Sequence, residues 1–454
     1  MKAMKTEIFD LPQTNAQAAM SEVADTTTVF DSMGAGRIQT RKVPGTNREY
    51  VPFGMDDQLP YELMRLVDGD EVTAQNKFFN VITCYGMGPE LQDTATGAAT
   101  TNADAQTWAR RNLLPSYFLN QCTDMKYFFF SVAVIILSRD GSHINRLVHK
   151  ESCYCRLEAA DGRGRIRNVF YADWRDGLPA PGAVERIPLL DMSDPWGDLC
   201  RRMGRDAITL QPMSDMPPSR DRKFAILLRY PTAGCQYYPV PYYSAMFRGG
   251  SYDEKRLISA GKRAKLRNHV SVKYQIEIVR GYFDRLCDDE GITDPVEQVE
   301  RVRREKENIR DFVAGVENSG KAFITQYYVD PDGHEVRDIR ITNLEGTKEG
   351  GDWGDDINVA ANTLCYADNV HPNLVGAVPG KSQSNNSGSD KRELFTMKQA
   401  CEKSFHDLLL IPLQMVCWYN QWKGVQPVVP MIMLTTLDEH QDAKQVTLSN
   451  TVKE

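Results

Sequence analysis

The sequence predicts an α+β fold in which a β-rich lobe is followed by two helices that bracket a small α/β module. Two strand pairs are expected in the lobe, because strand-like runs meet at Asp140-Gly141 and Asp161-Gly162, dipeptides typical of β-hairpin turns. Residues 271–345 show the order strand, helix and two strands. A long helical pattern then covers residues 390–422. These three observations predict an α+β chain.

Length and composition indicate a soluble globular protein of two or more lobes. The chain has 454 residues, of which 41% are hydrophobic and 25% charged. Its net charge of -7 argues against a protein that holds nucleic acid through an overall positive field, although a local basic patch is compatible with it. The first residues, MKAMKTEIFDLPQ, lack the apolar core of a secretory leader, and the most apolar run, YFFFSVAVIIL, is too short to span a bilayer. We therefore expect assembly in a cytosol and no membrane contact.

Cysteines and histidines form no metal or redox motif. Cys153 and Cys155 have strand spacing, which places both thiols on one face, and we expect them to be buried. His143 and His149 have no carboxylate or thiol at metal-ligand spacing. The segment DPDGHE places Gly333 two positions too early for a calcium loop, so a turn explains it better. The sequence thus predicts no metal, no cofactor and no catalytic residue.

Several segments in the first three quarters of the chain have patterns that predict local structure. Residues 1–45 show no period that could bury a face, and we expect a flexible arm. A first helix is expected near Pro60, and the GxG of Gly86 and Gly88 is more typical of a turn than of a dinucleotide site. A basic helix follows in SYDEKRLISAGKRAKLRNHV. In PVEQVERVRREKENIRDFVAG, a proline at the first turn and an apolar stripe predict a surface helix.

The stretch VPGKSQSNNSGSDKRE, Val378 to Glu393, could be a phosphate-binding loop or an exposed loop between helices. A Walker-type loop requires G-x-x-x-x-G-K-[ST], whereas Gly376 and Gly380 are one position too close together. The preceding residues have a helical period rather than a strand pattern, so the exposed loop is favoured. A P-loop-like NTPase that uses Gly376, Gly380, Lys381 and Ser382 stays as the alternative.

The last long segment predicts a helix with a kink. Asp390 and Glu393 form a capping box at its start. An apolar face continues to Tyr419, with Pro412 in the middle. A proline inside a helix removes a backbone hydrogen bond and costs about 3 kcal/mol, so we expect a bend at Pro412 with Leu408 to Leu410 packed inward.

This order of elements resembles the portal protein family of tailed bacteriophages, the head-tail connectors. ENSGKAFIT at Glu317 to Thr325 is similar to a stretch that precedes a short strand in portals, and NVHPNLVG at Asn369 to Gly376 is similar to their helix-proline-apolar-glycine stretch. The polar loop and the apolar-proline pair Ile411-Pro412 follow at the expected distances. The front segments GMDDQLPYELMRLV and CYGMGPEL resemble portals of phages or prophages of gut bacteria.

The resemblance implies a portal-like fold with the following division. It comprises a flexible N-terminal arm (1–45), a wing (46–250), stem helix 1 (251–270), a clip (271–350), stem helix 2 (353–376), a tunnel loop (377–389), a kinked helix that returns to the wing (390–422), and a C-terminal wing strand with a short tail and a reduced or absent crown (423–454).

The resemblance also implies a function without enzymatic activity. The chain would form a homo-oligomeric ring, a dodecamer, at the unique capsid vertex of a virion assembled in the host cytoplasm. Double-stranded DNA would pass through it without sequence specificity during packaging and ejection. Its partners would be the terminase large subunit, the major capsid and scaffold proteins, and a head-tail adaptor. A capsid or head-tail adaptor protein of different fold is a further alternative.

Site residues follow from this assignment. The channel loop would present Lys381, Ser382, Gln383, Ser384, Asn385, Asn386 and Ser387 to the DNA. Asp355, Asp356 and Asp368 are candidates for the channel lining, because an acidic wall suits passage of DNA better than capture. Either stem helix is compatible with facing the DNA. Arg303, Arg304 and Arg310 on the clip helix are candidates for motor and adaptor binding.

Overall fold

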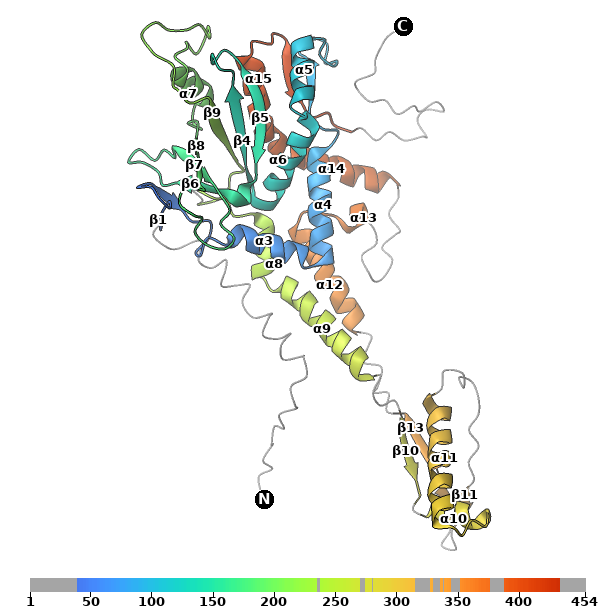
Figure 1. Ribbon diagram of the computed structural model, residues 1–454. Coiled ribbons are helices and arrows are strands. Elements are labelled where there is room, and N and C mark those ends of the chain that lie inside the picture. The colour runs from blue at the N-terminus through green and yellow to red at the C-terminus, as the bar shows by residue number, and fades with distance from the viewer. Residues whose placement is uncertain are drawn as a thin grey trace, which may run out of the picture. The chain divides into compact units, whose positions relative to one another are not determined.

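The chain forms two compact units. The computed structural model (Figure 1) describes residues 39–234, 237–269, 274–279, 281–314, 327–329, 335–337, 339–343, 352–375 and 388–432. Among the described residues, the smaller unit comprises those between Leu257 and Asp355, and the larger unit comprises those up to Arg256 and those from Asp356 onward. The boundaries fall inside helices α9 (Ser251–His269) and α12 (Asp352–Ala367).

Two antiparallel sheets organise the larger unit. The five-stranded sheet has the order β1-β2-β6-β7-β8, and the three-stranded sheet has the order β5-β4-β9. Their strands are β1 (Arg41–Lys42), β2 (Glu49–Val51), β4 (Phe130–Leu137), β5 (Ile144–Lys150), β6 (Cys155–Glu158), β7 (Asn168–Tyr171), β8 (Glu185–Pro188) and β9 (Lys223–Arg229). Both predicted hairpins are confirmed, since β4 pairs with β5 and β6 pairs with β7. A separate pair joins β3 (Glu90–Asp93) to β14 (Val425–Val428).

Helices cover the central strand β4 and explain its apolar sequence. Ala133 and Ile135 belong to one buried cluster, and Val132 and Val134 to another, because successive strand residues point to opposite faces. A strand that is buried on both faces needs a continuous apolar run, and FSVAVIIL supplies it. The surrounding helices are α3 (Leu59–Asp68), α4 (Glu71–Tyr85), α5 (Ala103–Arg111), α6 (Leu114–Phe128), α7 (Pro195–Arg202) and α8 (Ala245–Arg248).

The C-terminal helical segment differs from the predicted kinked helix. It consists of two helices, α14 (Gly388–Leu409) and α15 (Ile411–Tyr419), preceded by the short α13 (Pro372–Val375). Pro412 lies in the first turn of α15, where a backbone N–H has no partner within the helix and its absence from proline therefore costs little. The prediction that Pro412 costs about 3 kcal/mol inside a helix is wrong. Leu409 and Leu410 are buried, as predicted. The helix begins at Gly388 and therefore before Asp390, the expected cap.

The smaller unit contains one more helix than the sequence predicted. β10 (Tyr274–Ile278) pairs with β13 (Ile339–Asn343), and β11 (Tyr327–Val329) pairs with β12 (Glu335–Arg337). Between β10 and the predicted helix α11 (Pro295–Ala314) lies α10 (Tyr282–Asp289). The apolar stripe of α11 is only partly covered, because Val296 and Val299 are each 72% exposed whereas Ile309 is buried.

Candidate functional site

The structure describes the chain on either side of the predicted channel loop, up to residue 375 and again from residue 388. Lys381, Ser382, Gln383, Ser384, Asn385, Asn386 and Ser387 lie outside the described residues, as do Gly376 and Gly380. The chain enters this segment from α12 and α13 and leaves it at the start of α14. The contacts of these three helices therefore determine how the loop is held.

Buried polar side chains tie the chain on both sides of the loop to α4. Lys77 of α4 forms an ion pair with Asp368, and the side-chain amide of Asn80 donates to the backbone carbonyl of Asp368 at 2.9 Å. From the other end of the loop, Lys398 of α14 donates to the Asn80 side-chain oxygen at 2.5 Å and to the Asn369 carbonyl at 3.1 Å. We name Lys77, Asn80, Asp368, Asn369 and Lys398 the loop anchor. One turn of α4 thus holds the residues that follow α12 close to α14.

The ion pairs continue from the loop anchor into the core. Lys398 lies 3.4 Å from a carboxylate oxygen of Glu402, whose other oxygen lies 2.5 Å from the ammonium nitrogen of Lys126 on α6. Two of the ammonium groups lie over aromatic rings, Lys77 over Tyr243 and Lys126 over Phe405. Three cations and two carboxylates therefore share a site that is largely shielded from water, since each residue is at most 7% exposed. Aromatic faces partly compensate the surplus positive charge.

Burial makes the charged form of these lysines costly. It lowers the pKa of Lys77 to about 8, although the carboxylate of Asp368 opposes the change. The pKa of Lys398 is lowered as well, again mainly by burial and with Glu402 in opposition. A network of this kind is most costly when it loses one member, because the remaining charge is then buried without a partner.

The position of Asp368 corrects its assignment to the channel lining. Its side chain is buried and paired with Lys77, so it cannot present a carboxylate to a channel from this position. The sequence suggested exposure because helix 353–376 contains no lysine or arginine, whereas the cation comes from α4, 291 positions away along the chain. Asp355 and Asp356, by contrast, are exposed.

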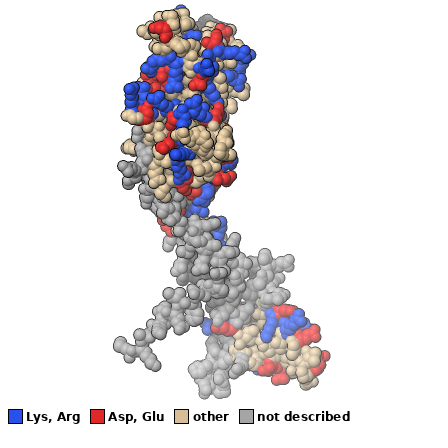
Figure 2. All heavy atoms as spheres, turned by 60° about the vertical axis from the view of Figure 1, so that its left-hand side comes forward, with Lys and Arg blue, Asp and Glu red and all other residues tan. Residues whose placement is uncertain are grey.

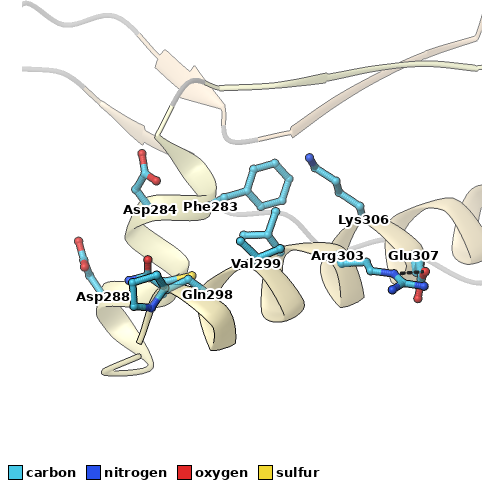
Figure 3. A pocket seen from close by; sticks show the side chains of 11 residues that line it. Phe283, Asp284, Asp288, Gln298, Val299, Arg303, Lys306 and Glu307 are labelled. Atoms are coloured by element: carbon cyan, nitrogen blue, oxygen red, sulfur yellow. Dashed lines mark hydrogen bonds and ion pairs between the residues drawn. The ribbon is translucent and has the colours of Figure 1, made fainter. Parts of the chain in front are cut away.

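The clip arginines lie beside a groove between α10 and α11. The groove has a volume of about 850 Å³ and is lined by Phe283, Asp284, Cys287, Asp288, Pro295, Gln298, Val299, Val302, Arg303, Lys306 and Glu307. Figure 3 shows Asp284 and Asp288 at one end and Arg303 and Lys306 at the other. Arg303 is 78% exposed and pairs with Glu307 at 3.2 Å. Arg304 is exposed too, while the side chain of Arg310 lies outside the described residues.

Two features of the described residues bear on other classes of function. No helix among them combines the length and the hydropathy that crossing a membrane requires. No group of three or more His, Cys, Asp or Glu side chains in the same residues is placed to hold a metal ion. The thiols of Cys153 and Cys155 are buried, as expected.

Comparison with known proteins identifies the fold. No family model and no curated protein sequence matches the chain. Among solved structures, "Neck of empty GTA particle computed with C6 symmetry" is similar with a TM-score of 0.52 and 13% identity, over 88% of each chain. "Virion of native gene transfer agent (GTA) particle" is similar with a TM-score of 0.51 and 14% identity, over 91% of this chain and 87% of that one. The chain therefore has the α+β fold of a component of these phage-like particles, which confirms the predicted fold class and the resemblance.

Proposed function

We propose that this protein is a portal, a ring at one vertex of a phage capsid through which DNA enters and leaves. The observation that carries the proposal is the likeness to a particle neck over 88% of both chains, a neck whose structure has sixfold symmetry imposed. A likeness that spans nearly the whole chain includes both compact units, and not only a single shared module. The wing, stem and clip boundaries expected from the sequence are part of this proposal.

The loop anchor suits a loop that must keep its place while DNA slides past. A long polar segment gains little by packing, so its position depends on its two ends. Here the buried side chains of Lys77, Asn80 and Lys398 hold the chain on both sides of the loop against α4. We infer that Lys381 to Ser387 reach the channel and that the exposed Asp355 and Asp356 line it. An acidic wall limits phosphate binding and favours passage.

The groove between α10 and α11 is the proposed docking surface for the terminase motor and, later, for a head-tail adaptor. Charged groups of both signs flank an apolar centre formed by Phe283 and Val299. Such a combination is typical of interfaces in which an apolar centre contributes affinity and a charged rim contributes specificity. The major capsid and scaffold proteins are further proposed partners of the ring.

Sedimentation velocity and negative-stain images of the purified full-length chain test the proposal. We expect a closed ring with a central opening. A strictly monomeric species at micromolar concentration over a range of salt concentrations would contradict it.

A further inference from the structure

An arginine-lined basin in the larger unit is not used by the function proposed above. It has a volume of about 770 Å³ and lies where the loop between β6 and β7 meets β8, β9 and α7. Figure 2 brings forward the side of α7 and β8 and shows Lys and Arg side chains gathered over this face. Seven arginines line the basin: Arg48, Arg163, Arg165, Arg167, Arg186, Arg202 and Arg229.

Ion pairs neutralise only some of these arginines. Carboxylates lie within 3.3 Å of four of them, in the pairs Arg48–Glu158, Arg165–Asp191, Arg167–Asp161 and Arg202–Asp198. Arg163 and Arg186 are exposed, and no carboxylate of the described residues forms an ion pair with either. The basin therefore has a positive surplus in a chain whose net charge is -7.

The lining favours an acidic polypeptide over a nucleic acid. Ile166, Pro188 and Met192 are half-buried and add apolar surface, for which a phosphate backbone has no counterpart. Arg163 and Arg186 give the basin its positive surplus, which calls for a partner with negative charge. An extended polypeptide segment with carboxylates and apolar side chains matches both the positive charge and the apolar surface of the basin.

This chain contains such a segment outside the described residues. Residues 434–442, LTTLDEHQD, place Leu434 and Leu437 beside Asp438, Glu439 and Asp442. The described chain ends just before it, at residue 432, whose backbone N–H donates to Gln399 of α14 at 2.8 Å. In Figure 1, α14 lies on the opposite side of the larger unit from α7 and β8.

We propose that the basin of one copy binds residues 434–442 of a neighbouring copy, a proposal that rests on the proposed ring. Rings are built from heterologous contacts, in which one side of a subunit meets a different surface of the next. Ten residues of extended chain span up to about 35 Å, which is enough to cross a subunit boundary. The segment supplies the negative charge and the basin the positive charge of one repeated contact.

Charge reversal in the full-length chain tests the contact. We expect Arg163→Glu with Arg186→Glu, and separately Asp438→Lys with Glu439→Lys, to raise the concentration at which half the chains are assembled by roughly tenfold, because attraction becomes repulsion. Mass photometry measures this concentration. Combining all four changes should restore assembly toward that of the wild type. Arg111→Glu with Arg146→Glu, at two other exposed arginines, is the matched control and should leave assembly unchanged.

The outcomes separate this inference from the ring itself. If rings form and both reversals leave assembly at the wild-type level, the contact is wrong and the ring stands. If the wild type does not assemble, the proposed function fails. The docking site is then tested separately, by titrating a labelled peptide of residues 431–446 with the full-length chain and measuring fluorescence anisotropy. Binding that Arg163→Glu with Arg186→Glu abolishes would support the docking site, whereas no binding would overturn it. Binding of a short DNA duplex in place of the peptide would also overturn it.

Discussion

Removing Lys77 from the loop anchor should destabilise the larger unit strongly. In Lys77→Met the ammonium group is lost while the chain length is nearly kept, so the carboxylate of Asp368 stays buried without its cation. Its second oxygen already has no hydrogen-bond partner within the described residues. Breaking a buried pair in this way costs about 3–5 kcal/mol, because the remaining charge is neither paired nor hydrated.

The expected change in melting temperature follows from the size of the unit. Unfolding entropy is about 2.1 cal/mol/K per residue, and roughly 280 described residues belong to the larger unit, so a loss of 3–5 kcal/mol corresponds to about 5–8 °C. Lys77→Met with Asp368→Asn removes both charges, and we expect it to recover most of this loss. Differential scanning calorimetry of the four proteins of this double-mutant cycle measures the coupling.

The exposed pair of Lys403 and Asp407, also in the larger unit, is the matched control. Both side chains are more than half exposed, so Lys403→Met should change stability by less than about 1 kcal/mol. Equal melting temperatures for Lys77→Met and Lys403→Met would refute the buried ion pair. A double variant as unstable as Lys77→Met would refute the idea that the unpaired carboxylate is the cause.

Three further predictions address pH, the loop and the clip. The pKa of Lys77 is lowered to about 8 in the folded chain. Between about pH 8 and the ordinary lysine pKa, the unfolded chain therefore binds more protons than the folded chain. Over that pH range Lys77 makes the free energy of unfolding rise with pH. The melting temperature of the wild type minus that of the Lys77→Met, Asp368→Asn variant should therefore increase from pH 8 to pH 10; a constant difference would contradict the assignment. Deleting Ser384 to Ser387 removes less than half of the loop 377–389, and even a twofold change in loop length alters the closure free energy by only about 0.6 kcal/mol, so ring assembly should stay intact. DNA packaging measured by nuclease protection should fall, and unchanged packaging would remove the loop from the channel. Reversing Arg303, Arg304 and Arg310 to Glu should weaken terminase binding in a pull-down titration without altering ring formation, and an unchanged affinity would place the docking surface elsewhere.

Local patterns predicted the elements whose causes are local. Asp140-Gly141 forms its hairpin turn because glycine adopts the positive φ of 71° that the turn needs. Pro295 begins α11 because proline lacks a backbone N–H, and an N–H at a helix start has no partner within the helix. The order of these elements along the chain then sufficed for the resemblance that the fold comparison confirms.

Long-range contacts account for what the sequence did not show. The charges of Lys77 and Asp368 are typical of solvated helix faces until the fold brings α4 and α12 together. Pro412 suggested a kink within one helix, but α14 ends at Leu409 and Pro412 lies in the first turn of the next helix, α15. The arginine basin combines the motif GRGRIR with side chains from β8 and β9, which no local pattern connects.

A cryo-electron microscopy reconstruction of the purified full-length chain would test the central claim most directly. The account predicts a closed symmetric ring around a channel wide enough for duplex DNA, with residues 381–387 at its inner surface and the α10–α11 groove on the outside. A closed ring in which residues 381–387 face away from the channel, or a particle with no channel, would contradict it.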